Sequence, residues 1–156
     1  MNRDDVSVLA ERLGRINPRL QPMVSHEFGD AVMAVPLEDL KPTLNELRQA
    51  GFDRLGMVTA VDFEDRFEVV YRLHSRSLSA GVFVKADISR EEPSVESVFD
   101  LWPAALWQER EVFDLFGIDF AGHPDLRRIL LPEDFEGHPL RKDYDDGRLI
   151  RRPDYI

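Results

Sequence analysis

The sequence of 156 residues contains no cysteine. This absence excludes disulfide bonds, a cysteine nucleophile, thiolate zinc sites and an iron–sulfur cluster with cysteine ligands from the chain itself. If the protein takes part in electron transfer, another chain must therefore carry the redox centres.

Basic residues are also few. The chain has 20 Lys and Arg against 30 Asp and Glu, a formal net charge of −10 and a pI of about 4.8. Nucleic-acid binding depends on clustered cations that neutralise phosphates, and docking on anionic lipid needs a similar basic patch. The charge balance argues against both kinds of partner.

Long hydrophobic runs are missing as well. No segment approaches the roughly 18–20 apolar residues that a membrane-spanning helix requires. The first residues, "MNRDDVSVLAERLGRI", carry acids where a signal peptide needs a basic start and an apolar core. We therefore expect a cytoplasmic protein that meets a membrane only through other chains.

The first part of the chain predicts an α+β domain. Apolar spacing indicates a helix over residues 4–16, and a second helix ends at Ala50 with Pro42 at a first helical position. A weak strand is expected over 22–28 and a buried strand over 31–35. Short links between the next apolar runs favour antiparallel pairing, and those strands are predicted at 55–63, 67–74 and 81–88. N-terminal helices would then pack on a small, largely antiparallel sheet.

The second part changes character. Residues 94–117 are predicted to be helical, with Pro103 dividing a short turn from a helix over 103–116 that Gly117 closes. From 121 to 156, proline and glycine recur too often for a long helix or strand. Apolar anchors such as "LRRILL" indicate an extended but anchored arm. We therefore divide the chain into an α+β domain, 1–120, and a docking arm, 121–156.

One charged residue on the predicted helix is misplaced. On a 3.6-residue period, Glu109 shares the apolar side with Trp102, Val112 and Phe116. A carboxylate there is costly unless it is paired. Glu109 and Glu111 point roughly 200° apart, so they cannot act as a catalytic carboxylate pair on one substrate.

The remaining charges suggest how the helix and the arm interact. Arg110 and Asp114 are four residues apart and can pair with each other. Glu109 and Glu111 then need cations, from this chain or from a partner, unless the acidic run is simply a solvated face. The arm offers four candidates: Arg127, Arg128, Arg141 and Lys142.

The arm contains Gly-His-Pro twice, which raises the question of a metal site. His123 and His138, with Asp125 or Asp143, are residue types that bind zinc. However, the histidines are fifteen residues apart on backbone stiffened by proline, which favours fixed structural or interface hydrogen bonds. No Ser/His/Asp pattern or phosphate-binding glycine loop appears, so no catalytic, cofactor-binding or metal-binding residue is assigned.

A longer pattern covers both the helix and the arm. The stretch "EREVFDLFGIDFAGHPDLRRIL", residues 109–130, resembles the signature of the complex I 30 kDa subunit family of NADH-quinone oxidoreductases. The continuation "LLPEDFEGHPLRKDY", 130–144, is also similar to that family. The signature and interface residues are Glu109, Arg110, Glu111, Asp114, His123, Arg127, Arg128, His138, Arg141 and Lys142.

The resemblance implies a cofactor-free, peripheral-arm subunit of a proton-translocating NADH:quinone oxidoreductase. Such a subunit would scaffold the large hydrogenase-like subunit of the quinone site and neighbouring iron–sulfur subunits. Those partners would carry FMN, the iron–sulfur clusters, NADH and quinone. The expected location is the cytoplasmic face of the inner membrane, and catalysis would belong to the complex rather than to this chain.

Three alternatives stay open. The same subunit could serve a sister complex, such as a ferredoxin- or deazaflavin-linked dehydrogenase or a membrane-bound hydrogenase, because other chains bind the electron donor. A stand-alone metalloenzyme would use His123, His138 and the nearby acids. A soluble adaptor unconnected with respiration is the third.

Overall fold

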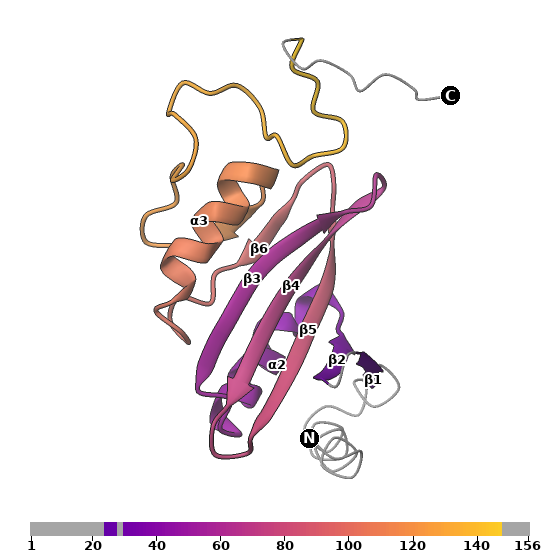
Figure 1. The fold of residues 1–156 in the computed structure, drawn as a ribbon, viewed down its shortest axis with the longest axis vertical. Helices are drawn as coiled ribbons and strands as arrows, with labels where there is room; N and C mark the ends of the chain where they lie inside the picture. Colours follow the sequence, from indigo (N-terminus) through magenta and orange to yellow (C-terminus); the bar gives the residue numbers. More distant parts are fainter. Residues whose placement is uncertain (1–23, 28–29, 148–156) are drawn as a thin grey trace, which may run out of the picture.

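The computed structural model describes residues 24–27 and 30–147 of the chain. The predicted helix over 4–16 lies outside the described residues. Within them, a five-stranded sheet is accompanied by two helices, a small two-stranded sheet and an arm without regular structure (Figure 1). The predicted α+β class is therefore confirmed.

The main sheet has the strand order β1-β2-β5-β4-β3. The pairs β1/β2, β3/β4 and β4/β5 are antiparallel, whereas β2 and β5 run parallel. The two short links that were expected to close hairpins do so, at residues 63–65 and 76–79. The strands are β1 Val24–Glu27, β2 Asp30–Ala34, β3 Arg54–Asp62, β4 Arg66–Ser75 and β5 Ala80–Ser89.

Helix α2, Leu37–Gln49, connects β2 to β3. Its buried positions include Leu40, Leu44 and Leu47, which follow the predicted apolar spacing. The placement of Pro42 at the first helical position was wrong, because the helix already begins at Leu37 and Pro42 lies inside it. Proline has no N–H to donate to residue 38, so α2 loses one internal hydrogen bond there.

The core lies on one face of the sheet. The odd-numbered β4 residues Phe67, Val69, Tyr71 and Leu73 are fully buried and join a cluster that includes residues of both helices. The opposite face carries ion pairs such as Lys85–Glu68, at 3.8 Å. This alternation follows the two-residue period of a half-buried strand.

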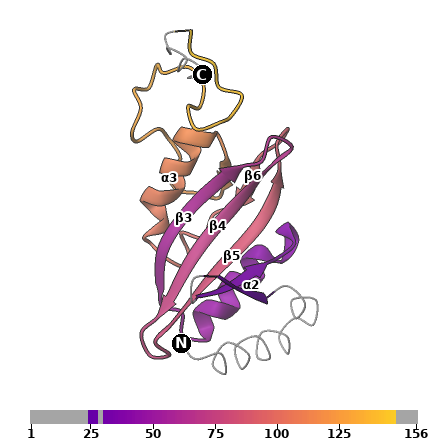
Figure 2. The same ribbon diagram turned by 45° about the vertical axis from the view of Figure 1, so that its right-hand side comes forward.

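Helix α3, Ala105–Phe116, lies beside β3 and ends at Gly117 in the left-handed conformation, with φ +69° (Figure 2). The predicted helix over 103–116 is therefore confirmed to within two residues. The helical prediction for residues 94–96 was wrong. Those residues form β6, Ser94–Glu96, which pairs in parallel with β7, Asp119–Ala121, on the other side of α3 in the sequence.

The arm follows directly after β7. Over residues 122–147 it contains turns but no helix or strand, and it folds over the C-terminal end of α3 (Figures 1 and 2). No helix in the described part of the chain is long and apolar enough to cross a membrane.

Candidate functional site: helix α3 and the arm

Asp114, in the last turn of α3, fixes the backbone of the arm. Its side chain is fully buried. One oxygen, Oδ2, accepts hydrogen bonds from three successive backbone amides, those of residues 129, 130 and 131, at 3.0, 2.8 and 2.9 Å. The other, Oδ1, accepts from Arg128 Nη1 at 2.7 Å. A single carboxylate therefore determines the path of the arm where it crosses the helix.

These donors determine the charge state of Asp114. Burial alone would raise its pKa, but the hydrogen bonds from the Leu131 amide, the Arg128 guanidinium and the two neighbouring amides lower the pKa to about 2. Asp114 is therefore an anion under all physiological conditions.

Arg128 joins α3 to a more distant part of the arm. Besides the Asp114 carboxylate, its guanidinium donates to the Asp114 carbonyl at 3.1 Å and to the carbonyls of Phe135 and Gly137 at 2.9 and 3.0 Å. It also lies 5.9 Å from the centre of the Phe135 ring. Because one side chain binds both helix α3 and residues 135–137, it closes the arm into a loop against the helix.

Arg110 holds the same stretch of the arm from the middle of α3. Its Nε and Nη2 donate to the carbonyls of Arg127 and Arg128, at 3.0 and 2.9 Å. The guanidinium also lies 5.5 Å from the centre of the Trp107 ring. The predicted ion pair between Arg110 and Asp114 was wrong, because the arm supplies the partners of both side chains.

Glu109 is fully buried, as its position on the apolar side predicted, but its partners differ from the expected cations. Its Oε2 accepts from Ser97 Oγ at 2.6 Å and its Oε1 from the Val98 amide at 2.8 Å. His123 Nε2 lies 4.0 Å from Oε2. Burial raises the pKa of Glu109 despite these donors. The predicted pairing of Glu109 with an arginine of the arm was therefore wrong. Because the Glu109 side chain is buried, a partner protein cannot reach it either.

The two histidines make separate hydrogen bonds. His123 accepts from the Asp125 amide at Nδ1, so Nε2 carries the proton and donates to the Leu106 carbonyl at 3.1 Å. His138 donates from Nδ1 to the Asp114 carbonyl at 2.9 Å. Burial, together with the charges of Arg141 and Arg128, lowers the pKa of His138. The described residues contain no group of three or more histidines and carboxylates placed to hold a metal ion.

Arg141 binds the C-terminal end of α3. Its Nε donates to the Phe116 carbonyl at 2.5 Å and its guanidinium lies 5.1 Å from the centre of the buried Phe67 ring. A Cβ atom on Gly117 would lie 2.5 Å from the His138 ring and 2.7 Å from Arg141 Nη2. Glycine is therefore required at this position both for its positive φ and for this close approach.

A second buried carboxylate, Asp62 at the end of β3, holds the next part of the arm. It accepts from the Lys142 amide at 2.9 Å, from the Glu64 amide at 2.9 Å and from Arg90. Arg90 in turn pairs with Asp143 at 2.9 Å. Sequence reasoning missed Asp62, although an acid at an inward-facing position of β3 was the available signal.

Three predicted site residues remain on the surface. Glu111 is exposed, and Arg127, whose side chain is 63% exposed, pairs with Asp125 at 3.0 Å. Lys142 uses its backbone amide on Asp62, while its ammonium group lies 3.8 Å from the exposed Glu64. We use the term arm clasp for the set that binds the arm to the domain: Asp62, Arg110, Asp114, Arg128 and Arg141.

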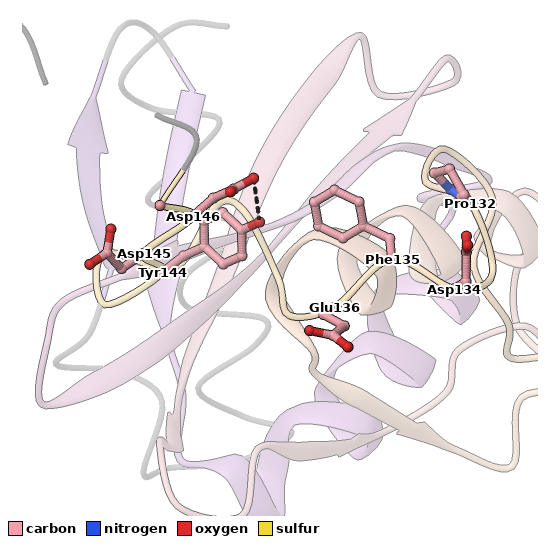
Figure 3. Close-up of a pocket in the computed structure, with 8 residues that line it drawn as sticks. Pro132, Asp134, Phe135, Glu136, Tyr144, Asp145 and Asp146 are labelled. Atoms are coloured by element: carbon pink, nitrogen blue, oxygen red, sulfur yellow. Dashed lines mark hydrogen bonds between the residues drawn. The ribbon is translucent and has the colours of Figure 1, made fainter. Parts of the chain in front are cut away.

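A hollow of about 660 Å³ is lined by residues of the arm between positions 132 and 147 (Figure 3). The rings of Phe135 and Tyr144 stack at 6.2 Å, and Tyr144 donates to Asp146 at 3.5 Å. The carboxylates of Asp134, Glu136, Asp145 and Asp146 also line it. This part of the arm is therefore strongly acidic.

Acid should loosen the arm only below about pH 4. The pKa values of Asp62 and Asp114 are lowered from 3.8 to about 2. A lowered carboxyl pKa contributes stability that is complete above the unfolded value and is lost as the pH falls through the folded value. Each lowering corresponds to about 2 kcal/mol.

Urea denaturation of the wild type, Asp62→Asn and Asp114→Asn between about pH 3 and pH 7 measures this contribution. The wild-type advantage in free energy of unfolding should stay constant above about pH 4 and shrink below it. An advantage that grows on acidification would contradict the assignment of these two anions.

The chain matches known proteins over most of its length. The family model described as "Respiratory-chain NADH dehydrogenase, 30 Kd subunit" matches residues 33–148. The chain is 45% identical over 137 residues to the C-type subunit of the NADH-quinone oxidoreductase of Moorella thermoacetica, covering 86% of this chain and 91% of that protein.

Two further comparisons concern larger assemblies. The chain is 46% identical over 125 residues to the combined C/D-type subunit of the NADH-quinone oxidoreductase of Bdellovibrio bacteriovorus, covering 78% of this chain and 22% of that protein. It also superposes on a chain in the structure of the membrane-bound sulfane sulfur reductase, an archaeal respiratory membrane complex. The TM-score is 0.80 at 26% identity, covering 89% of this chain and 85% of that chain.

Proposed function

Because the chain belongs to the respiratory-chain NADH dehydrogenase 30 Kd subunit family, we propose that it is a scaffold subunit of a proton-translocating NADH:quinone oxidoreductase. It works in the peripheral arm of the complex and binds no cofactor of its own. Residues that could have served catalysis, such as Glu109 and His123, are held by structural hydrogen bonds instead.

The arm clasp is the observation that supports this role most strongly. Arg110, Asp114 and Arg128 use their charges inside the chain, and together they fix an irregular segment in one conformation. Fixing a segment before it meets a partner reduces the entropy lost on binding. The arm has no regular structure of its own at this point. The buried, hydrogen-bonded charges therefore serve to give its surface one fixed shape.

The proposed partners are the large hydrogenase-like subunit that forms the quinone site, called the D-type subunit below, and the neighbouring iron–sulfur subunits. A relative that combines the names C and D in one polypeptide supports contact with the D-type subunit, since fusion keeps two modules at high effective concentration. FMN, NADH, the clusters and quinone would reside in those partners. The complex would hold this chain at the cytoplasmic face of the membrane.

A sister complex with another electron donor or acceptor is the second candidate. The TM-score of 0.80 to a chain of the archaeal sulfane sulfur reductase supports it, because the same fold occurs in a respiratory complex with different chemistry.

Purification of the native complex tests the proposal. The chain, tagged at its N-terminus, is isolated from gently solubilised membranes, and its partners are identified by mass spectrometry. We expect flavin and iron–sulfur subunits together with NADH-to-quinone activity. The same kinds of subunit without NADH oxidation would identify a sister complex. Recovery of the chain alone would contradict the scaffold role.

A further inference from the structure

Three large apolar side chains remain on the surface of α3 and the arm. The exposed fractions are 57% for Trp107, 62% for Leu130 and 51% for Leu140. The other exposed large apolar residues in the described part of the chain, such as Leu78 and Phe63, reach at most 42%. The three most exposed apolar side chains of that part therefore lie in this one region.

The arm clasp determines where these side chains are presented. Trp107 lies against the Arg110 guanidinium, the Leu130 amide is bound by Asp114, and the Leu140 amide donates to the Leu115 carbonyl at 3.1 Å. Trp107 and Asp114 are two helical turns apart on one side of α3, about 10 Å along its axis. The three apolar groups thus follow the helix on backbone that is already fixed.

Exposure of this kind is costly unless a partner covers it. Covering an indole and two leucines removes a large apolar area from water, and this burial is the main favourable contribution to most protein association. Tryptophan is also one of the residue types enriched at the energetic centres of protein interfaces. Trp107 is therefore the expected centre of an interface, with the two exposed leucines adding apolar area beside it.

The charges around the anchor restrict the partner. Residues 125–147 contain seven acids and four Lys or Arg, a difference of −3. Of the cations, Arg128 and Arg141 are used by the arm clasp and Arg127 pairs with Asp125. Glu111 and Glu133 are exposed. A complementary surface must therefore combine an apolar recess with a basic rim.

We propose that Trp107, Leu130 and Leu140 are the anchor by which this chain docks onto the D-type subunit, which receives them in an apolar recess surrounded by basic side chains. The inference rests on the proposed function. It goes beyond that function by assigning the contact to apolar residues, whereas the charged signature residues only hold these apolar residues in position. Glu109, Arg110 and Asp114 then affect docking indirectly, through the shape of the arm.

The test uses the intact complex with Trp107→Ala, Leu130→Ala and the double variant, each expressed as the sole copy of the chain. Leu78→Ala is the matched control, because it removes an exposed leucine, 42% accessible, from the turn between β4 and β5. We expect the D-type subunit recovered with the chain to fall at least about tenfold for the double variant and to be unchanged for Leu78→Ala.

Purified chains provide the folding control. The melting temperature and the trypsin sensitivity of the arm should match the wild type for Leu130→Ala, whose side chain is exposed. Trp107→Ala could release the arm through the lost Arg110 contact. In that case Leu130→Glu is used as the test variant instead, since a charge placed in the recess of the D-type subunit should also prevent docking.

The outcomes separate the inference from the proposed function. If the double variant recovers the D-type subunit as fully as the wild type does, the anchor assignment is overturned but the proposed function is not. Loss of a different subunit, or of a second copy of this chain, assigns the surface to another occupant and overturns the choice of partner. Failure of the wild type to retrieve any subunit overturns the proposed function as well.

Discussion

Replacing Asp114 with alanine should release the arm and lower the free energy of unfolding by about 3–5 kcal/mol, the usual cost of removing one member of a buried ion pair. The substitution leaves the amides of residues 129–131 and the Arg128 guanidinium without their acceptor. The affected Arg128 side chain is only 16% exposed, so water cannot fully replace the carboxylate. Urea denaturation measures the stability, and limited trypsin digestion reports the release of the arm.

Neighbouring arginines provide a matched control for this result. Arg128→Ala should resemble Asp114→Ala, because the guanidinium also binds the carbonyls of Phe135 and Gly137. Arg127→Ala removes the same group from the adjacent, 63% exposed position and should change stability by no more than about 0.5 kcal/mol. Equal effects of the two arginine variants would contradict the assignment of Asp114 and Arg128 as the centre of the arm clasp.

Glu109→Ala should destabilise the chain by about 2–6 kcal/mol, since two buried donors lose their acceptor at about 1–3 kcal/mol each. Those donors are the Ser97 hydroxyl and the Val98 amide, both at the junction between β6 and the turns that lead to α3. Glu109→Gln keeps one amide oxygen as an acceptor and the same shape, so it should retain most of the stability. Chemical denaturation of both variants measures the difference.

The pH dependence of Glu109 has the opposite sign to that of Asp114. Burial raises its pKa, so the folded chain favours the protonated carboxyl and loses stability as the pH rises from the unfolded value through the folded value. The advantage of the wild type over Glu109→Gln should therefore be larger at low pH.

The exposed Glu111 is the control for Glu109. It lies two residues further along α3, and Glu111→Ala should leave the stability of the isolated chain within about 0.5 kcal/mol of the wild type. Assembly should follow the stability of the variants, falling for Glu109→Ala and persisting for Glu109→Gln. If Glu109→Gln folded normally but failed to assemble, the charge itself would be needed and the structural role would be wrong.

Periodicity predicted most of the regular structure. The spacing of Leu40, Leu44 and Leu47 identified the buried side of α2, and the alternation through β3, β4 and β5 located three strands to within two residues. These signals are local, because a helix or strand repeats its inward side at a fixed interval. Burial of Glu109 followed from the same reasoning.

The partners that side chains and strands find in distant parts of the chain could not be predicted from periodicity. Arg110 and Asp114 have the correct spacing to pair on an isolated helix, yet the arm offers Arg110 two carbonyls and offers Asp114 three amides and a guanidinium. Backbone donors carry no sequence signal, so the competition was invisible. The strand β6 was missed for a similar reason, since its partner β7 lies 25 residues away at Asp119.

The bond from the Lys142 amide to Asp62 joins residues 80 positions apart, so it can form only after the whole stretch between them has been made. A ribosome that makes the chain from the N-terminus produces β3, β4 and β5 well before residue 142. Those strands pair through short hairpins, whereas closing the arm must wait for a long loop. The surface of the arm is therefore completed only after residue 142 has been made, so a chain cut before the arm can build the sheet without presenting the finished arm to other subunits.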